Sequence, residues 1–289
     1  MENANVCAPA RKKDSSSCMT LDELKDVAEA YNIYVKMGVV KNAPVDISDD
    51  KTSLVRQLHN RLSRVCKDQV CWVKQAFMKH AKNKKKIIND AFKPEGPDGQ
   101  FDWLSTHDIL KVVRQYQALH KDFIFLGAVP MDFMQLPYVG IKDLNIQMLY
   151  DKGKRRIGIV FNTDTSRGKG KHWNAMYADL NKGCIFFYDS TGNPPDQRIT
   201  QLVHKIASWM LGREITPSGP YMTKKKNNIE KELQIEWNKK AHQMGNTECG
   251  VYAMHFIISM LNGTTFSEFC RNGHSDAEIN KFRAKYFRM

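Results

Sequence analysis

The sequence has no long hydrophobic run, and none of its apolar stretches approaches the roughly 20 residues that cross a bilayer. Its first residues, Met1-Glu2-Asn3, are polar and acidic, so we expect no secretory signal peptide. They also lack the glycine that N-myristoylation requires. A mean hydropathy of −0.51 and a hydrophobic content of 42% predict a soluble protein with a packed core.

Cysteine occurs without the paired spacing of a disulfide framework or a zinc site. Seven cysteines are spread over 289 residues, which predicts reduced thiols and an intracellular protein. Cys66 and Cys71 have no second pair of ligands beside them. The segment Gly168-Lys-Gly-Lys171 lacks the upstream glycine and the following Ser or Thr of a phosphate-binding loop. We therefore expect neither a metal nor a cofactor.

Acidic residues are in the minority. The chain has 44 Lys and Arg against 31 Asp and Glu, which gives a net charge of +13 and a pI of about 9.3. This balance favours an acidic partner such as nucleic acid. A solvated basic surface without a specific ligand explains the same charge, so both interpretations stay open.

A linker divides the chain. Pro94-Glu-Gly-Pro-Asp-Gly99 is the strongest turn signal in the sequence, and it predicts a basic helical arm domain at 1–95 and a larger domain at 96–289. In the arm, Thr20-Leu-Asp-Glu23 forms a capping box that starts a helix. A second helix is expected around Leu54 to Leu62, and a third over Val70 to Ile88.

The larger domain is predicted to be α+β. Strands are expected at Phe123–Val129, Ile157–Phe161, Trp173–Ala178, Ile185–Tyr188 and around Leu233–Trp237. Helices are expected near Ile109–Tyr116, at Ile199–Leu211, at Gly250–Leu261 and after Ser275. The helix at 250–261 is apolar nearly all round, which is typical of a buried helix. The fold expected here is a mixed β-sheet packed on that central helix.

Three segments supply the residue types of a thiol protease. Cys249 directly precedes the buried helix, where unpaired N–H groups and the helix dipole favour its thiolate. His172 opens a strand after a flexible basic loop, and Asp189 ends the next strand. Antiparallel pairing of these strands would place the carboxylate beside the imidazole and fix its tautomer.

Other residues near Cys249 have possible roles in binding. The amide of Gln243 could donate to a developing oxyanion together with the N–H of Cys249, and Asn246 competes for that role. Gly250 would leave room for a substrate backbone. Taken singly, each of these residues is equally well explained as a polar or small loop residue.

Together, His172-Trp173, Tyr188-Asp189-Ser190 and Gln243…Glu248-Cys249-Gly250 resemble the signature of the Ulp1/adenain class of cysteine proteases. The resemblance covers roughly residues 100 to 289. Further stretches resemble the polyprotein-processing proteases of large DNA viruses, typified by that of African swine fever virus. These stretches are Phe161-Asn-Thr-Asp164, Ser190-Thr-Gly-Asn193, Asn246-Thr-Glu-Cys249 and Lys281-Phe-Arg283. The orienting residue of that viral enzyme is Asn, whereas this chain has Asp189.

The resemblance implies a papain-type core and a Cys249–His172–Asp189 triad with Gln243 as oxyanion donor. It also implies substrates with Gly-Gly before the cleaved bond, threaded under a roof that Trp103 and Trp173 would form. Expected substrates are viral structural polyproteins, cut during virion maturation in the virus factory of the host cytoplasm and in the virion. A SUMO- or ubiquitin-removing isopeptidase is the first alternative.

The arm domain suggests a different role. Its segment from Leu21 to Leu62 is faintly similar to SAP-type DNA-binding modules. Contacts with substrate or scaffold are the first expectation for the arm and DNA the second. A non-catalytic nucleic-acid-binding protein on a protease scaffold is therefore the remaining alternative.

Overall fold

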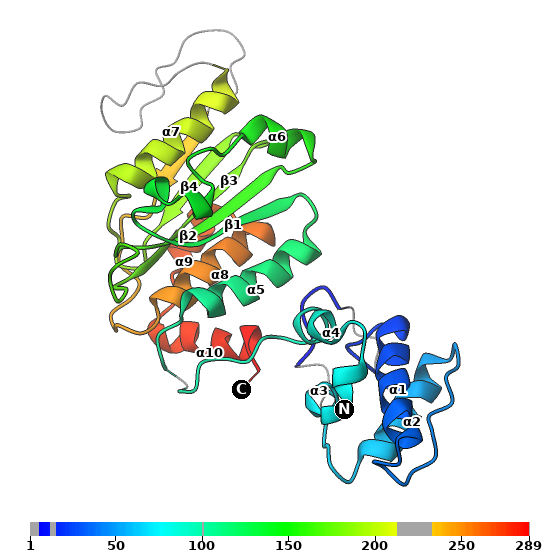
Figure 1. The fold of residues 1–289 in the computed structure, drawn as a ribbon. Coiled ribbons are helices and arrows are strands. Elements are labelled where there is room, and N and C mark those ends of the chain that lie inside the picture. The colour runs from blue at the N-terminus through cyan, green and yellow to red at the C-terminus, as the bar shows by residue number, and fades with distance from the viewer. Residues whose placement is uncertain (1–5, 12–15, 100, 213–232, 289) are drawn as a thin grey trace. The chain divides into compact units, whose positions relative to one another are not determined.

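The computed structural model describes residues 6–11, 16–99, 101–212 and 233–288, and the chain divides into two compact units (Figure 1). The arm unit comprises the residues up to Glu95 and the C-terminal residues from Lys285 on, and the core unit is Gly96–Ala284. The C-terminal end joins the arm unit because the N–H of Arg288 donates to the carbonyl of Pro94 at 2.9 Å. We expected the larger domain to run from 96 to 289, but the core unit ends at Ala284.

The arm unit is helical. Its elements are α1 (Leu21–Lys36), α2 (Lys51–Leu62), α3 (Gln69–Lys74), the 3-10 helix η2 (Ala76–His80) and α4 (Lys84–Ala91). The expected capping box is present, since Thr20 Oγ1 accepts from the N–H of Glu23 and the Glu23 carboxylate accepts from the N–H of Thr20. The helices enclose a core of their own around Leu24, Leu58 and Trp72.

The single helix predicted over Val70 to Ile88 is wrong. The chain becomes extended at Gln75 and again at Ala81, which separates α3, η2 and α4. Part of the reason lies more than 50 residues away in the sequence, at the buried Asp26 on α1. Its two carboxylate oxygens accept from the backbone N–H groups of Lys82 and Asn83, each at 2.8 Å. This non-local contact holds the backbone between η2 and α4 and leaves no sequence signal nearby.

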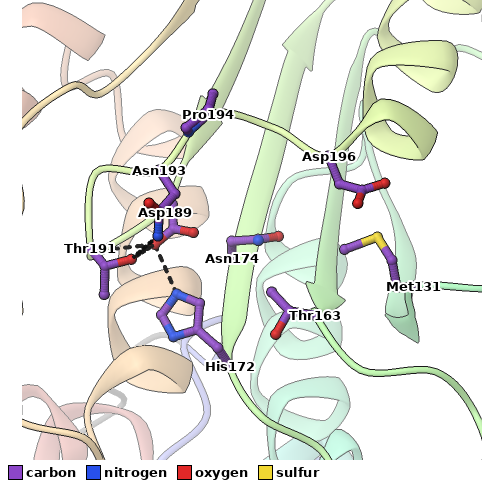
Figure 2. A pocket seen from close by; sticks show the side chains of 9 residues that line it. All are labelled: Met131, Thr163, His172, Asn174, Asp189, Thr191, Asn193, Pro194 and Asp196. Atoms are coloured by element: carbon purple, nitrogen blue, oxygen red, sulfur yellow. Dashed lines mark hydrogen bonds and ion pairs between the residues drawn. The ribbon is translucent and has the colours of Figure 1, made fainter.

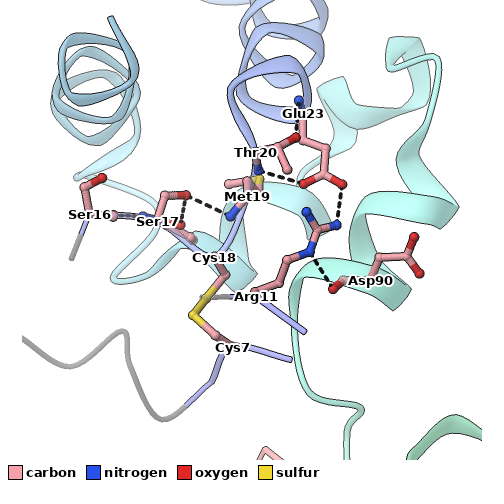
Figure 3. Close-up of a disulfide and its surroundings, with 10 residues drawn as sticks. Cys7, Arg11, Ser16, Ser17, Cys18, Met19, Thr20, Glu23 and Asp90 are labelled. Atoms are coloured by element: carbon pink, nitrogen blue, oxygen red, sulfur yellow. Dashed lines mark hydrogen bonds and ion pairs between the residues drawn. A yellow bond between two sulfur atoms is a disulfide. The ribbon is translucent and has the colours of Figure 1, made fainter. Parts of the chain in front are cut away.

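The prediction of reduced thiols is wrong for four cysteines of the arm unit. Disulfides join Cys7 to Cys18 and Cys66 to Cys71. In Figure 3 the first disulfide ties down the N-terminal segment, whose Arg11 bonds to Glu23 and to the carbonyl of Asp90. Each pair closes a short loop, with sequence separations of 11 and 5 residues. Cys184, Cys249 and Cys270 of the core unit are free.

The core unit is built on a mixed sheet. Its strands are β1 (Phe123–Pro130), β2 (Arg156–Asn162), β3 (Trp173–Asp179), β4 (Cys184–Tyr188) and β5 (Gln234–Trp237). They lie in the order β1-β2-β3-β4-β5. The pairs β1–β2 and β4–β5 are parallel, and β3 pairs antiparallel with both neighbours. The α+β fold class and the mixed sheet are confirmed.

Helices cover both faces of this sheet (Figure 1). They are α5 (Thr106–Leu119), α6 (Ile146–Asp151), α7 (Gln197–Leu211), α8 (Cys249–Leu261), α9 (Phe266–Asn272) and α10 (Asp276–Tyr286), with short 3-10 turns at Phe133–Gln135 and Pro137–Val139. Helix α8 is buried along its whole length and packs on β3. Helix α7 packs its apolar side against β2 and β3 from the opposite face. Among the described residues, no helix is long and apolar enough to span a membrane.

Candidate active site

His172 stands at the entrance to β3 because the β2–β3 loop is closed behind it. The N–H of Thr163 donates to the carbonyl of His172 at 2.9 Å. The side-chain oxygen of Asn162 accepts from the N–H groups of Asp164 and Lys171 at 2.9 and 3.1 Å. These bonds fold the basic loop onto the strand ends. The imidazole remains 20% exposed at the edge of the sheet.

Asp189 follows β4 and faces His172. Its Oδ1 lies 2.8 Å from Nε2 of His172 and also accepts from the N–H and hydroxyl of Thr191 (Figure 2). The backbone of Asp189 is held by Asn238, whose side-chain amide accepts from its N–H at 2.9 Å and donates to its carbonyl at 2.6 Å. The antiparallel pairing of β3 and β4 thus brings the predicted base and orienter together.

Cys249 is the first residue of α8 and is 2% exposed. Its thiol lies close enough to His172 to help raise the pKa of the imidazole, through hydrogen bonding and charge. Nε2 of the ring is already taken by Asp189. The structure therefore unites all three predicted triad residues at one end of the sheet, with the sulfur at the positive end of a helix dipole.

The electrostatics of this trio favour a charged imidazole. Burial alone lowers the pKa of His172, but the hydrogen bonds to Asp189 and Cys249 outweigh it and raise the pKa to about 9. Burial raises the pKa of Asp189, yet the bonds from His172 and Thr191 hold it below its usual value. An imidazolium next to sulfur stabilises a thiolate, which is the reactive form of cysteine.

Ser190, which the sequence signalled only through the protease resemblance, joins the segments of the site. The carbonyl of Ser190 accepts from the N–H groups of His242 and Gln243 at 2.8 and 3.0 Å. The hydroxyl of Ser190 donates to the side-chain oxygen of Gln243 at 2.6 Å. The turn after Asp189 is thereby fixed to the loop that leads to Cys249.

Arg283 of α10 supports the same loop from the other side. It is 1% exposed and donates to the carbonyls of Thr247 and Asp102 at 3.0 and 2.9 Å. Burial lowers its pKa, while the nearby Glu248, Cys249 and Asp102 act in the opposite direction. A buried guanidinium thus lies within electrostatic range of the thiol. The sequence signalled Arg283 only through the viral-protease resemblance.

The predicted oxyanion residues differ in their placement. Gln243 is buried, and its amide nitrogen donates to the carbonyl of Gly245 at 3.0 Å. One of the two amide hydrogens is therefore engaged in the loop itself. Asn246 is exposed. The oxyanion role of either residue stays a prediction.

The predicted substrate-facing aromatics also differ. Trp103 is 46% exposed, whereas Trp173 is 5% exposed and its indole N–H donates to the carbonyl of Leu104 at 2.9 Å. Gly250 does not open onto free space, because a Cβ atom there would lie 2.9 Å from Cβ of Leu104. The glycine instead lets Leu104 pack against the start of α8. The roofing role of the two tryptophans stays a prediction.

A cavity of about 380 Å³ adjoins the imidazole (Figure 2). It is lined by Met131, Thr163, His172, Asn174, Asp189, Thr191, Asn193, Pro194 and Asp196. In the described part of the chain, no cluster of three or more His, Cys, Asp or Glu side chains is placed to hold a metal ion. The cavity and the trio beside it are the features from which we derive the chemistry of the site.

Comparison with known proteins identifies the family and the fold. Residues 155–289 match the Ulp1 protease family, C-terminal catalytic domain. A putative thiol protease of Acanthamoeba polyphaga mimivirus is 34% identical over 98% of this chain and 93% of its own length. A SUMO-1 cysteine protease of African swine fever virus is 26% identical over 71% of this chain and 74% of its own length. The crystal structure of an African swine fever virus protease has the same fold, with a TM-score of 0.68, 19% identity and coverage of 100% of this chain and 98% of that one.

Proposed function

This chain belongs to the Ulp1 protease family and is a cysteine protease, and from that premise we propose that it cleaves viral structural polyprotein precursors after Gly-Gly during virion maturation. The observation that carries the proposal is the contact of His172 with both the Asp189 carboxylate and the Cys249 thiol. The mimivirus and African swine fever virus relatives, which this chain matches over most of their length, are viral proteases.

The proposed reaction uses only groups of this chain and water. The thiolate of Cys249 attacks the scissile carbonyl. The backbone N–H of Cys249 and the side chain of Gln243 hold the oxyanion that forms. His172 then gives its proton to the departing amine, which leaves a thioester on the sulfur. Water attacks the thioester with His172 as base, and the carboxylic acid product departs. Asp189 keeps the ring oriented throughout.

Limited access to the sulfur supports Gly-Gly as the preferred sequence before the cleaved bond. Cys249 is 2% exposed, and Leu104 packs directly against Gly250 beside it. An extended backbone without side chains fits such a confined approach better than bulky residues do. The proposed places of action are the virus factory and the particle, and the two arm-unit disulfides favour the particle over the reducing cytosol.

An isopeptidase acting on SUMO-like conjugates is the second candidate. One observation favours it: the African swine fever virus relative is a SUMO-1 cysteine protease. Incubation with a SUMO vinyl sulfone and, separately, with a Gly-Gly-Xaa peptide distinguishes the two candidates. We expect peptide cleavage. Labelling by the SUMO probe without peptide cleavage would overturn the maturation proposal.

Replacement of the nucleophile tests the mechanism. Cys249→Ser should lower kcat/KM for the peptide by at least about 1,000-fold, because a serine hydroxyl beside this histidine is far less ionised than a thiol. Any DNA binding by the basic arm should survive this change, measured by an electrophoretic shift at stated salt. Cleavage that persists in Cys249→Ser would remove the thiol mechanism and favour a contaminating protease or another site.

A further inference from the structure

The cavity beside His172 contains an unsatisfied buried polar group. Asn174 on β3 is 4% exposed, and its Oδ1 accepts no hydrogen bond from any described residue. Figure 2 shows this side chain pointing into the space lined by Thr163, Met131 and Asp196. A buried polar atom without a partner costs free energy, so its retention calls for an explanation.

The position of Asn174 on the strand separates it from the apolar core. Along β3, Met176 and Ala178 lie on the same face as Asn174 and pack against Ile199 and Leu202 of α7. At residue 174 this apolar row stops and the cavity begins. A leucine would continue the row, whereas the amide presents a hydrogen-bonding group to the cavity.

The cavity adjoins the imidazole of the site. Neither Cys249 nor the Leu104 and Gly250 that pack against each other beside it lines the cavity. His172 does line it, and in the proposed mechanism His172 protonates the amine that leaves. The residue attached to that amine is therefore the nearest part of a substrate to Asn174.

The lining of the cavity favours a hydrogen-bond donor. Beyond the His172–Asp189 pair, it offers the unpartnered Asn174 oxygen and the hydroxyl of Thr163, whereas the Asp196 carboxylate already accepts from Arg198. Besides His172, no lysine, arginine or other cationic side chain is among the residues that line it. Rotation about χ2, which is broad for asparagine, can bring the amide to a ligand.

We propose that Asn174 and this cavity form a subsite for the side chain that follows the scissile bond and that the subsite prefers a hydrogen-bond donor there. The inference rests on the proposed function. It makes Asn174 a specificity-determining residue that contacts substrate and leaves the bond-breaking chemistry to the triad.

Four peptides that differ only after Gly-Gly test the preference. Glutamine and lysine donate hydrogen bonds, methionine matches glutamine in size without donating, and glutamate only accepts when ionised. We expect kcat/KM to be about three- to tenfold higher for glutamine and lysine than for methionine and glutamate, as one net hydrogen bond predicts. Equal cleavage of all four would overturn the subsite and leave the proposed function standing. Failure to cleave any of them would overturn both.

Variants separate recognition from structure. Asn174→Leu keeps the branched shape of the side chain and removes the unsatisfied oxygen, and the cavity has room for its larger methyl groups. We therefore expect the glutamine-over-methionine preference to vanish while the melting temperature stays equal or rises. Asn174→Ser retains an acceptor and should keep part of the preference, which covers the case of a leucine variant that fails to fold. Asn272 is exposed, so Asn272→Ala is the matched control and should keep the full glutamine-over-methionine preference. An unchanged preference in both Asn174 variants would overturn the proposal and mean that the amide holds an ordered water only.

Discussion

His172 makes two contacts that act on its charge in the same direction. Asp189 lies 2.8 Å from Nε2 of the ring, and the nearby Cys249 also raises the pKa of the imidazole. Together they overcome the effect of burial and raise the pKa of the imidazole to about 9. At neutral pH the ring therefore carries its proton, which suits the step in which the amine leaves.

The identity of residue 189 should set the alkaline limit of activity. In Asp189→Asn the hydrogen bond to Nε2 can persist, but the negative charge is lost, so the pKa of His172 should fall. We expect kcat/KM near neutral pH to drop by about tenfold or less and the alkaline limb of the pH profile to move to lower pH. Asp189→Ala removes the orienter and should cost about 100-fold or more. An unchanged alkaline limb in Asp189→Asn would show that His172 does not control it.

The same pair should make stability depend on pH. A pKa raised in the folded state stabilises it fully below the unfolded value of about 6.5 and loses that effect as pH rises through about 9. Chemical denaturation should therefore show the free energy of unfolding of the core unit falling between these values, by on the order of 3 kcal/mol. In His172→Gln this slope should be absent. A slope that persists in the variant would assign it to other groups.

At the scale of elements, the turn after β4 tolerates substitution of Gly192 poorly. Gly192 has φ +78°, and a Cβ there would lie 2.9 Å from the backbone nitrogen of Ala241. Both constraints fall on the turn that connects Asp189 to the loop before Cys249. The glycine is thus required by conformation and by close approach at once.

Gly192→Ala should cost about 2–4 kcal/mol of the free energy of unfolding, because left-handed strain of about 1–2 kcal/mol is joined by a backbone clash. Gly212→Ala is the matched control, since Gly212 has φ +63° but nothing lies within 4 Å of the position that an added methyl group would take. Gly212→Ala should cost only the left-handed strain of about 1–2 kcal/mol, without the clash. Thermal unfolding of both variants measures the difference, and equal losses would deny the close contact at Gly192.

The elements also show what the sequence could and could not predict. The strands and α8 were predictable because their apolar composition is local to each segment, and the order of His172, Asp189 and Cys249 was readable as a resemblance. The break between η2 and α4 was not, because it depends on Asp26. The resemblance included Ser190 but not its role, because that role depends on carbonyl and hydroxyl contacts with a loop that lies 53 residues further along the chain. Non-local hydrogen bonds of this kind leave no periodic pattern.

At the scale of the whole molecule, covalent constraint is confined to one unit in the described part of the chain. Both disulfides lie in the arm unit, whereas Cys184, Cys249 and Cys270 of the core unit are free. The sequence predicted the same reduced state for all seven cysteines because no spacing motif sets these four apart. The two units should therefore respond differently to reductant.

Reduction should loosen the arm unit and leave catalysis intact. Loops with separations of 11 and 5 residues correspond to about 3 and about 2 kcal/mol of lost stabilisation. Calorimetry of the full chain in dithiothreitol should show one transition moved down by roughly 20–40 °C, while Gly-Gly peptide cleavage is unchanged or higher because Cys249 stays reduced. The double variant Cys7→Ser/Cys18→Ser should show part of that shift without reductant. If dithiothreitol instead moved the transition that active-site ligands stabilise, the covalent constraint would have to act on the core unit, contrary to the placement of both disulfides.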